Sequence, residues 1–286
     1  MKVLEISSLS VSFGKDLKIS DSEMVIETGD VALLTGANGC GKSTIIKIIM
    51  GATFEYNNLR YNGTKAYYYS GSDKHELLKS EKEMEFFRRN VCYVSQEDEF
   101  ESDSVFDCFI NSINYKGIKN KEQYVFAFLM KFSAADAFFQ TTDDVTIDRK
   151  CLRLARKLGI KASSLSDKEK KALKLLTLNT KHLSGGQKKM VNILSNLIKY
   201  EKCNLIILDE PLNNLDYGNV RAFSNILTMI YKEKPDLAII IVTHCRSIPI
   251  INKVIEVDPS EKKLKIGETY RCSSCFGKID ANGLYC

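Results

Sequence analysis

The sequence predicts an α/β fold whose core is a buried sheet, and two observations carry that prediction. Three apolar runs, at residues 31–35, 205–208 and 238–242, lack the alternation of polar and apolar positions that a half-exposed strand shows. Such runs are typical of strands that are buried on both faces. Segments with room for a helix, at 44–50 and 220–233, follow the first two runs. We therefore expect an open α/β sheet, in which ligands bind at the carboxyl ends of the strands.

Composition favours a soluble, cytosolic protein. The length of 286 residues allows one or two domains, and the net charge of +5 does not by itself indicate nucleic acid or a membrane surface as a partner. No stretch approaches the roughly 18 consecutive apolar residues that a transmembrane helix needs, and the first residues predict a strand instead of a signal peptide. Nine cysteines are scattered along the chain, so reduced thiols are expected.

The loop after the first apolar run fits the phosphate-binding pattern G-x-x-x-x-G-K-[ST]. Its glycines allow successive backbone N–H groups to point at phosphate oxygens, and the following helix N-terminus adds partial positive charge. Lys42 supplies a charge for the β- and γ-phosphates, and Ser43 supplies a hydroxyl for Mg²⁺. A glycine turn used only for its shape is the alternative, but it would not require Lys-Ser after the last glycine. The predicted nucleotide-binding residues of this loop are Gly36, Asn38, Gly39, Gly41, Lys42, Ser43 and Thr44.

Two carboxylates follow the second apolar run. Asp209 stands at the carboxyl end of the predicted strand, where it can bind the metal or orient its water shell. Glu210 is placed to accept a proton from an attacking water. The alternative is an Asp-Glu pair in a polar turn before Pro211. The phosphate-binding loop in the same chain favours the catalytic interpretation.

A second loop of small residues, 183–187, also precedes a predicted helix. Apolar residues between 188 and 200 fall on one helical face. Ser184 could donate a hydrogen bond to a phosphate at that helix N-terminus. A generic Ser-Gly-Gly turn is the alternative.

The order of these motifs along the chain resembles that of the ATP-binding cassette (ABC) ATPases. Gln96 ends a strand-like run at 90–96, and His244 directly follows the run at 238–243, as in that family. The resemblance implies a P-loop NTPase fold of the α/β class, with a mixed-sheet core and an N-terminal antiparallel β part. It also implies a helical subdomain that carries the 183–187 loop. One cassette is expected, because the sequence contains no internal repeat.

The same resemblance implies roles for single residues. It implies that Gln96 reaches Mg²⁺ and the lytic water, that His244 contacts the γ-phosphate and that Asp216 belongs to a loop coupling two sites. It also implies that Phe13 lies against the adenine ring. Taken singly, these residues have plainer explanations: a polar residue after a strand, a histidine at a strand end and a phenylalanine in the core.

A dimer follows from the same resemblance. Two phosphate-binding loops of one chain cannot usefully bind the same γ-phosphate. The second loop is therefore expected to cap a nucleotide bound to a second cassette, in a homodimer or a heterodimer. The residues predicted to do so are Ser184, Gly185, Gly186 and Gln187. The predicted catalytic residues are Glu210, His244 and Gln96. The predicted Mg²⁺ ligands are Ser43, Gln96 and Asp209.

The predicted organisation is a nucleotide-binding domain at 1–258 and a cysteine-containing extension at 259–286. Within the domain, a helical subdomain at about 97–182 and an insertion at 52–90 are both longer than the family pattern requires. The charged stretch 74–89 predicts a helix with Phe86 and Phe87 turned inward.

The extension contains a C-x-x-C pair, Cys272 and Cys275, and ends on Cys286. This spacing is right for two ligands of a structural zinc ion, and Cys286 could be a third, but a complete site needs four. Solvent-exposed reduced thiols are the alternative.

The motifs together predict an ATPase that binds Mg·ATP. From the frequency of functions within the family, we expect the ATP-binding subunit of a separately encoded transmembrane transporter, located in the cytoplasm at the membrane. A second hypothesis is a soluble mechanoenzyme acting on nucleic acid, ribosomes or a protein complex. The long segments and the cysteine tail favour it, whereas the absence of heptads, a tandem cassette and a dense basic patch with aromatics opposes it. A third, a regulatory cassette that only binds ATP, is opposed by Glu210 and His244.

Overall fold

The computed structural model describes residues 1–13, 16–51, 59–61, 63–96, 102–113, 117–139, 145–243 and 248–267. Its contacts divide the chain into two compact units. Unit 1 comprises Met1–Gln96, Cys203–Pro211 and Lys234–Cys286. Unit 2 comprises Glu97–Lys202 and Leu212–Glu233.

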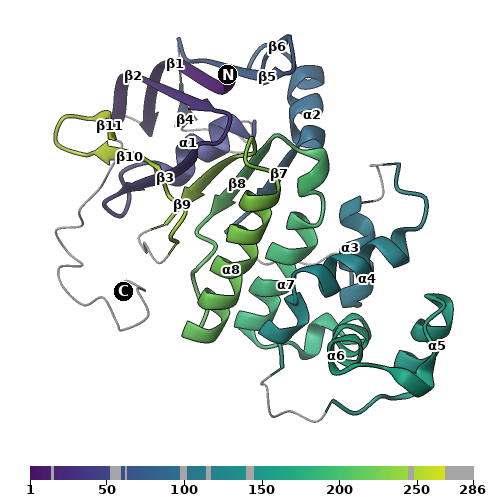
Figure 1. Cartoon of the computed structure of the whole chain (residues 1–286). Helices are drawn as coiled ribbons and strands as arrows, with labels where there is room; N and C mark the ends of the chain where they lie inside the picture. The colour runs from purple at the N-terminus through teal and green to yellow at the C-terminus, as the bar shows by residue number, and fades with distance from the viewer. Residues whose placement is uncertain are drawn as a thin grey trace. The chain divides into compact units, whose positions relative to one another are not determined.

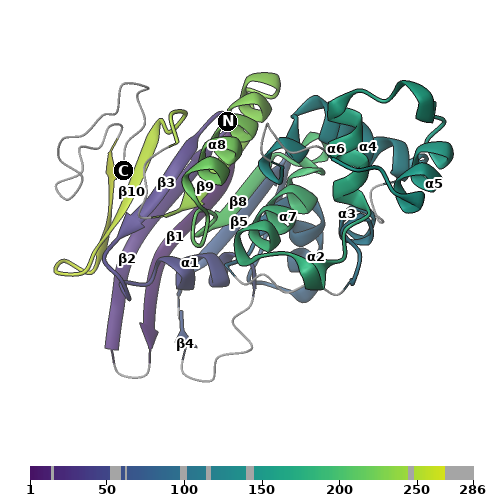
Figure 2. The same cartoon turned by 90° about the horizontal axis from the view of Figure 1, so that it is seen from below.

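Unit 1 contains the buried sheet that the apolar runs predict. Its six strands lie in the order β11-β10-β3-β9-β8-β7, and Figure 2 shows β10, β3, β9 and β8 side by side. All neighbours pair in parallel except β10 and β11, which form an antiparallel hairpin. Every residue of β8 and β9 is buried, as runs without polar alternation require. The strands are β3 (Val31–Gly36), β7 (Val91–Val94), β8 (Leu205–Asp209), β9 (Ala238–Val242), β10 (Lys253–Asp258) and β11 (Lys263–Gly267).

A second, antiparallel sheet of five strands completes unit 1. Its order is β2-β1-β5-β6, and β4 pairs with β1. Apolar residues of β1 and β2 share one core with residues of the parallel sheet and with Ile45, Ile46, Ile48 and Ile49 of α1. The strands are β1 (Lys2–Phe13), β2 (Asp16–Glu27), β4 (Leu59–Arg60), β5 (Lys65–Ser70) and β6 (Asp73–Glu76), and the helices of unit 1 are α1 (Lys42–Ile49) and α2 (Glu81–Asn90).

The helix predicted at 74–89 is shorter than expected. Residues 73–76 form β6, which pairs with β5, and α2 begins after Ser80, whose hydroxyl accepts a hydrogen bond from Glu83 N–H. Phe87 is fully buried, but the side chain of Phe86 is 37% exposed. Adjacent helical positions point about 100° apart, so the narrow apolar face of this charged helix does not bury both rings.

Unit 2 is helical, as Figure 1 shows for α3 to α7, drawn in teal and green. The segment at about 97–182, predicted as a helical subdomain, contains the helices α3, α4, α5 and α6. The helices are α3 (Val105–Ile113), α4 (Lys121–Lys131), α5 (Arg149–Lys157), α6 (Asp167–Leu176), α7 (Gly185–Leu197) and α8 (Tyr217–Glu233), with 3-10 turns η2 (Ala134–Ala137), η3 (Ala162–Ser164), η4 (Thr180–His182) and η5 (Tyr200–Lys202). In the described part of the chain, no helix has both the length and the apolar character needed to cross a membrane.

The proposed boundary at residue 258 stays a prediction. The first structured element after it is β11, which pairs with β10 through residues 263–267. The hairpin turn is held by Asp258, whose Oδ1 accepts hydrogen bonds from Ser260 N–H at 2.8 Å and Glu261 N–H at 3.1 Å. The start of the predicted extension is therefore part of the sheet of unit 1.

Replacing Phe87 by Ala should lower the free energy of unfolding by about 3–5 kcal/mol, because the ring is fully buried. Phe86→Ala is the matched control. It removes a stacking contact with His75, whose ring centroid lies 4.2 Å away, and should cost about 1 kcal/mol or less. Urea unfolding of both variants measures the difference, and equal losses would contradict the assigned burial.

Candidate nucleotide-binding site

The loop between β3 and α1 has a backbone that only glycine adopts without strain. Gly36, Gly39 and Gly41 have φ angles of 145°, 74° and 108°. A Cβ on Gly36 would lie 2.7 Å from the carbonyl oxygen of Val257 and 2.9 Å from Cys40 Sγ. The loop is therefore pressed against β10, and Gly36 is required both for its φ angle and for its size.

The N-terminus of α1 is suited to an anion. Gly41 is the N-cap residue and supplies no side-chain hydrogen bond, whereas Ser80, Asp148, Ser166 and Ser184 cap other helices with their side chains. The first amide groups of a helix have no acceptor within the helix. No acidic residue occupies the first turn of α1. These features fit a phosphate group at this position.

Lys42 holds its charge inside the loop. The residue is only 6% exposed, and its ammonium donates hydrogen bonds to the carbonyl oxygens of Gly36 at 3.0 Å and Ala37 at 3.1 Å. Three donors on a flexible stem allow this group to exchange a carbonyl partner for a phosphate oxygen.

Ser43 and Asp209 meet across 166 positions of sequence. The Ser43 hydroxyl donates to Asp209 Oδ1 at 3.3 Å, and Asp209 is 2% exposed. A hydroxyl and a carboxylate next to a phosphate-binding loop form the oxygen-rich set that Mg²⁺ prefers. The chemistry of this donor set therefore fits the predicted metal.

Glu210 follows Asp209 in a strained conformation. Its φ angle is 48°, a left-handed value that is rare for residues other than glycine, and the residue is 6% exposed. Its N–H donates to the carbonyl oxygen of Val242 at 2.9 Å, which extends the pairing of β8 with β9 by one residue. Glu210 therefore lies at the same sheet edge as Asp209, but its left-handed backbone directs its side chain differently.

The other predicted residues of unit 1 are described only in part. Gln96 is exposed and lies two residues beyond the end of β7, at the sheet edge where β8 also ends. Phe13 ends β1 and pairs with Asp16, but its side chain lies outside the described residues. His244 lies outside them too, as do the predicted zinc ligands Cys272, Cys275 and Cys286, so these assignments stay predictions.

Unit 2 brings three predicted residues to one pocket. Ser184, Gln187 and Asp216 all line a pocket of about 810 Å³, together with Phe132, Phe138 and Phe139. The Ser184 hydroxyl accepts from Gln187 N–H at 3.3 Å, and Gln187 Oε1 accepts from Ser184 N–H at 3.0 Å, so the two form a capping box. The predicted helix 188–200 thus begins earlier, at Gly185. The hydroxyl hydrogen of Ser184 is left to donate elsewhere.

Asp216 also has a structural task. Its Oδ1 accepts from Asn219 N–H at 2.8 Å, and its Oδ2 accepts from the Asn219 side-chain amide at 2.9 Å, at the start of α8. Gly185 and Gly186 open α7, and a Cβ on Gly186 would lie 3.2 Å from the carbonyl oxygen of Asn214. The two loops of unit 2 are therefore packed closely against each other.

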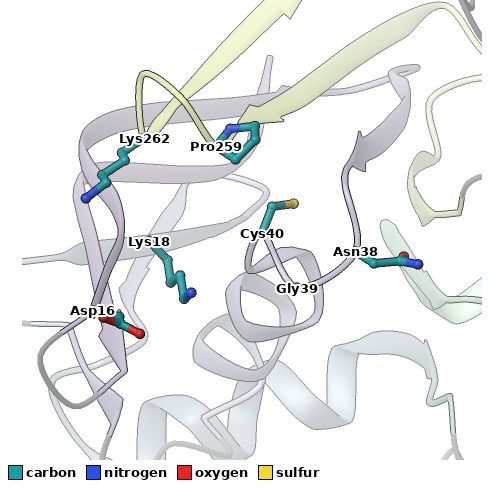
Figure 3. A pocket seen from close by; sticks show the side chains of 7 residues that line it. All are labelled: Asp16, Lys18, Asn38, Gly39, Cys40, Pro259 and Lys262. Carbon is teal, nitrogen blue, oxygen red and sulfur yellow. The ribbon is translucent and has the colours of Figure 1, made fainter.

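The structure adds residues that the sequence analysis missed. Asn38, Gly39 and Cys40 of the loop line a pocket of about 520 Å³ whose other walls come from β2 and from the turn between β10 and β11 (Figure 3). Those walls carry Asp16, Lys18, Pro259 and Lys262. The turn is tied to β2, because Ser20 N–H donates to the carbonyl oxygen of Lys262 at 2.7 Å. No local motif marks Lys18 or Lys262.

The strand, loop and helix around Lys42 place the chain among the P-loop nucleotide-binding proteins. The sequence model of the ABC transporter family matches residues 19–213, so the chain belongs to this family. It is an ATPase of the ATP-binding cassette class, as the order of motifs indicates.

Two curated relatives and one solved structure illustrate the relationship. The phosphate import ATP-binding protein PstB 2 of Aliivibrio fischeri is 25% identical over 241 residues, covering 84% of this chain and 74% of that protein. The zinc uptake system ATP-binding protein ZurA of Listeria innocua is 25% identical over 244 residues, covering 85% and 77%. A bacterial ABC transporter cassette solved as a dimer has a TM-score of 0.64 at 15% identity, covering 93% of this chain and 98% of that chain. That likeness confirms the α/β P-loop fold.

Gly36→Ala should weaken ATP binding by more than about tenfold, because the new Cβ forces the loop away from Val257. Gly159→Ala is the control. Gly159 has a φ of 73°, and a Cβ at this position would meet no atom within 4 Å, so this variant tests backbone strain alone. It should cost roughly 1 kcal/mol of stability with unchanged ATP affinity. Titration with a fluorescent ATP analogue measures the ATP affinity of both variants. Unchanged affinity in Gly36→Ala would contradict the role of the loop.

Proposed function

We propose that this chain is the ATP-binding subunit that energises a separately encoded transmembrane transporter. The observation that carries the catalytic part is the contact between Ser43 and Asp209, which joins the phosphate-binding loop to the end of β8 in one site. The transport part is supported by the relatives, which are named as ATP-binding proteins of phosphate import and of zinc uptake. Location in the cytoplasm, at the membrane through that partner, belongs to the same proposal.

The phosphate groups of ATP are assigned to the loop and α1. Lys42, with the amides at the N-terminus of α1, neutralises phosphate charge, and Thr44 in the first turn of the helix adds a hydroxyl. Mg²⁺, when bound with the nucleotide, supplies further charge for the β- and γ-phosphates. Ser43, Asp209 and Gln96 are assigned to hold it.

Hydrolysis needs a base and a positioned water. Glu210 is assigned as the base, since it follows Asp209 and leaves the strand from a left-handed backbone. His244, two residues after the end of β9, is assigned to the γ-phosphate. Positioning and charge stabilisation account for most of the acceleration in phosphoryl transfer, so these few groups suffice chemically.

The nucleoside part is assigned to the pocket beside the loop. Phe13 pairs with Asp16, and Asp16 and Lys18 line that pocket from β2. The ring of Phe13 would lie against adenine. The ammonium groups of Lys18 and Lys262 would contribute positive potential near the nucleotide.

The loop at the start of α7 is assigned to a second cassette. Ser184 keeps a hydroxyl hydrogen for a phosphate oxygen, and Gly185 and Gly186 place the helix N-terminus next to it. Asp216 and Gln187 line the same pocket of unit 2, so this face presents both predicted loops together. A structural neighbour solved as a dimer supports the pairing of two cassettes. The proposed pair is head to tail and closes over two ATP molecules.

Glu210→Gln should lower the rate of ATP hydrolysis by about 10²–10⁴ while ATP binding is retained, because the amide cannot accept the proton. Glu23→Gln, an exposed carboxylate on β2, is the control and should leave the rate unchanged. Phosphate release and nucleotide titration measure the two quantities. Hydrolysis by Glu210→Gln at the parental rate would show that Glu210 is not the base.

The transport role is tested by purifying tagged Glu210→Gln protein from its native cells in mild detergent with Mg·ATP. A polytopic membrane protein should be recovered in equal amount, because the closed cassette dimer holds its partner. A Lys42→Ala variant controls for the dependence on ATP. Recovery of soluble proteins or nucleic acid alone would contradict the transport role. It would favour the second hypothesis, a soluble mechanoenzyme.

A further inference from the structure

Helix α5 of unit 2 presents a face of positive charge. Five of its cations, at 149, 150, 153, 156 and 157, fall within an arc of about 120° of the helical wheel, and all five are exposed. Lys157 pairs with Glu122 of α4 at 2.8 Å, so it is left out of the face defined below. No acidic residue occurs between 149 and 166. We call Arg149, Lys150, Arg153 and Arg156 the basic face of α5.

The opposite side of α5 is anchored. Cys151, Ala155 and Leu158 are buried in a small apolar cluster with Leu173 of α6. Asp148 caps the helix by accepting from Lys150 N–H at 2.9 Å and Cys151 N–H at 3.0 Å. Figures 1 and 2 both show α5 as the outermost labelled helix of unit 2, beside α6. The basic face therefore has a fixed backbone and is turned away from the cluster that holds it.

The arginines of this face pair with no carboxylate in the part of the chain that the structure describes. Among the described residues, no ion pair involves Arg149, Arg153 or Arg156, whereas three lysines of α6 pair with Asp167, Asp136 and Asp148. Arg149 and Lys150 also stand in the first turn of α5, where cations oppose the helix dipole. Stability of the helix does not account for these residues, so an external partner is indicated.

The shape and composition of the basic face of α5 indicate which kind of partner it binds. The segment 145–167 contains no aromatic residue, so it offers no surface on which bases could stack. Its apolar side is buried in the cluster with α6, so it cannot insert into a bilayer as an amphipathic anchor does. A convex face of exposed guanidinium groups suits many phosphate groups spread over a plane.

We propose that the basic face of α5 binds the anionic lipid headgroups of a membrane surface. The choice of a membrane over another polyanion rests on the proposed transport function, which places the chain beside a bilayer. Each basic residue near an anionic surface contributes about 1 kcal/mol, or about fivefold in binding. The contact orients unit 2 against the lipid without any inserted segment.

The test is cosedimentation of the full chain with phosphatidylcholine vesicles that contain or lack phosphatidylglycerol. The wild type should bind only the anionic vesicles, and binding should fall as salt is raised, because the charges are exposed. The triple variant R149Q/R153Q/R156Q should bind about a hundredfold more weakly, from about fivefold for each lost charge. The single variant R153Q should lose about fivefold, which keeps the proposal testable if the triple variant does not fold.

The matched control is K79Q/K82Q/K232Q, which removes three exposed lysines elsewhere and changes the net charge equally. It should bind anionic vesicles as the wild type does. Equal weakening in both triple variants would mean that net charge matters and not this face, and absence of wild-type binding would likewise overturn the proposal.

A nucleic-acid partner is distinguished in the same experiment. If the basic face were required for binding a double-stranded RNA or DNA oligonucleotide, while anionic vesicles were not bound, the proposal would be wrong and nucleic acid would be the partner. The vesicles contain no protein, so the outcome does not depend on a transmembrane subunit. ATP hydrolysis by each variant separates a loss of lipid binding from a failure of the ATPase site.

Discussion

The parallel pairing of β3, β9 and β8 is the constraint on which the site depends. In this register, Leu34 lies opposite Val242, and Val242 lies opposite Asp209, so the carboxyl ends of the three strands meet at one edge. The loop that begins at Gly36 and the carboxylates at 209 and 210 are therefore neighbours, although 166 positions separate Ser43 from Asp209. Burial of every residue of β8 and β9, at about 1.5–3 kcal/mol for each large aliphatic side chain, maintains this arrangement.

The second sheet and the β10–β11 hairpin restrict the loop from outside. β10 leaves no room for a Cβ on Gly36, and the turn of the hairpin is bonded to Ser20 of β2. Lys18 of β2 and Lys262 of the turn thereby line one pocket beside the loop. Because these walls are held by backbone hydrogen bonds and a buried core, the candidate nucleotide site is preorganised, which lowers the cost of ordering it on binding.

Several helices of unit 2 begin at side-chain caps, and two of these caps are candidate functional residues. Ser184 and Asp216 accept hydrogen bonds from the first turns of α7 and α8, so the same side chains fix the loops that they belong to. Asp148 does this for α5, where the backbone N–H of Cys151 and the ammonium of Lys174 hold the pKa of its carboxyl group well below the usual range. This cap fixes where α5 begins, and helical spacing then places the cations of α5 on one face.

The sequence by itself determined the local pieces: the buried strands, the phosphate-binding loop between β3 and α1, and the presence of a helix after the 183–187 loop, because short-range spacing and turn chemistry specify them. It did not distinguish Phe86 from Phe87, and it did not indicate β6, β11 or Lys18 and Lys262. These depend on strand pairing and packing between segments far apart in the chain, which no local pattern encodes. The sequence, through its resemblance to a family, assigned Ser43 and Asp209 to one metal, but only the tertiary structure shows the contact between them, because the sheet register brings the two together.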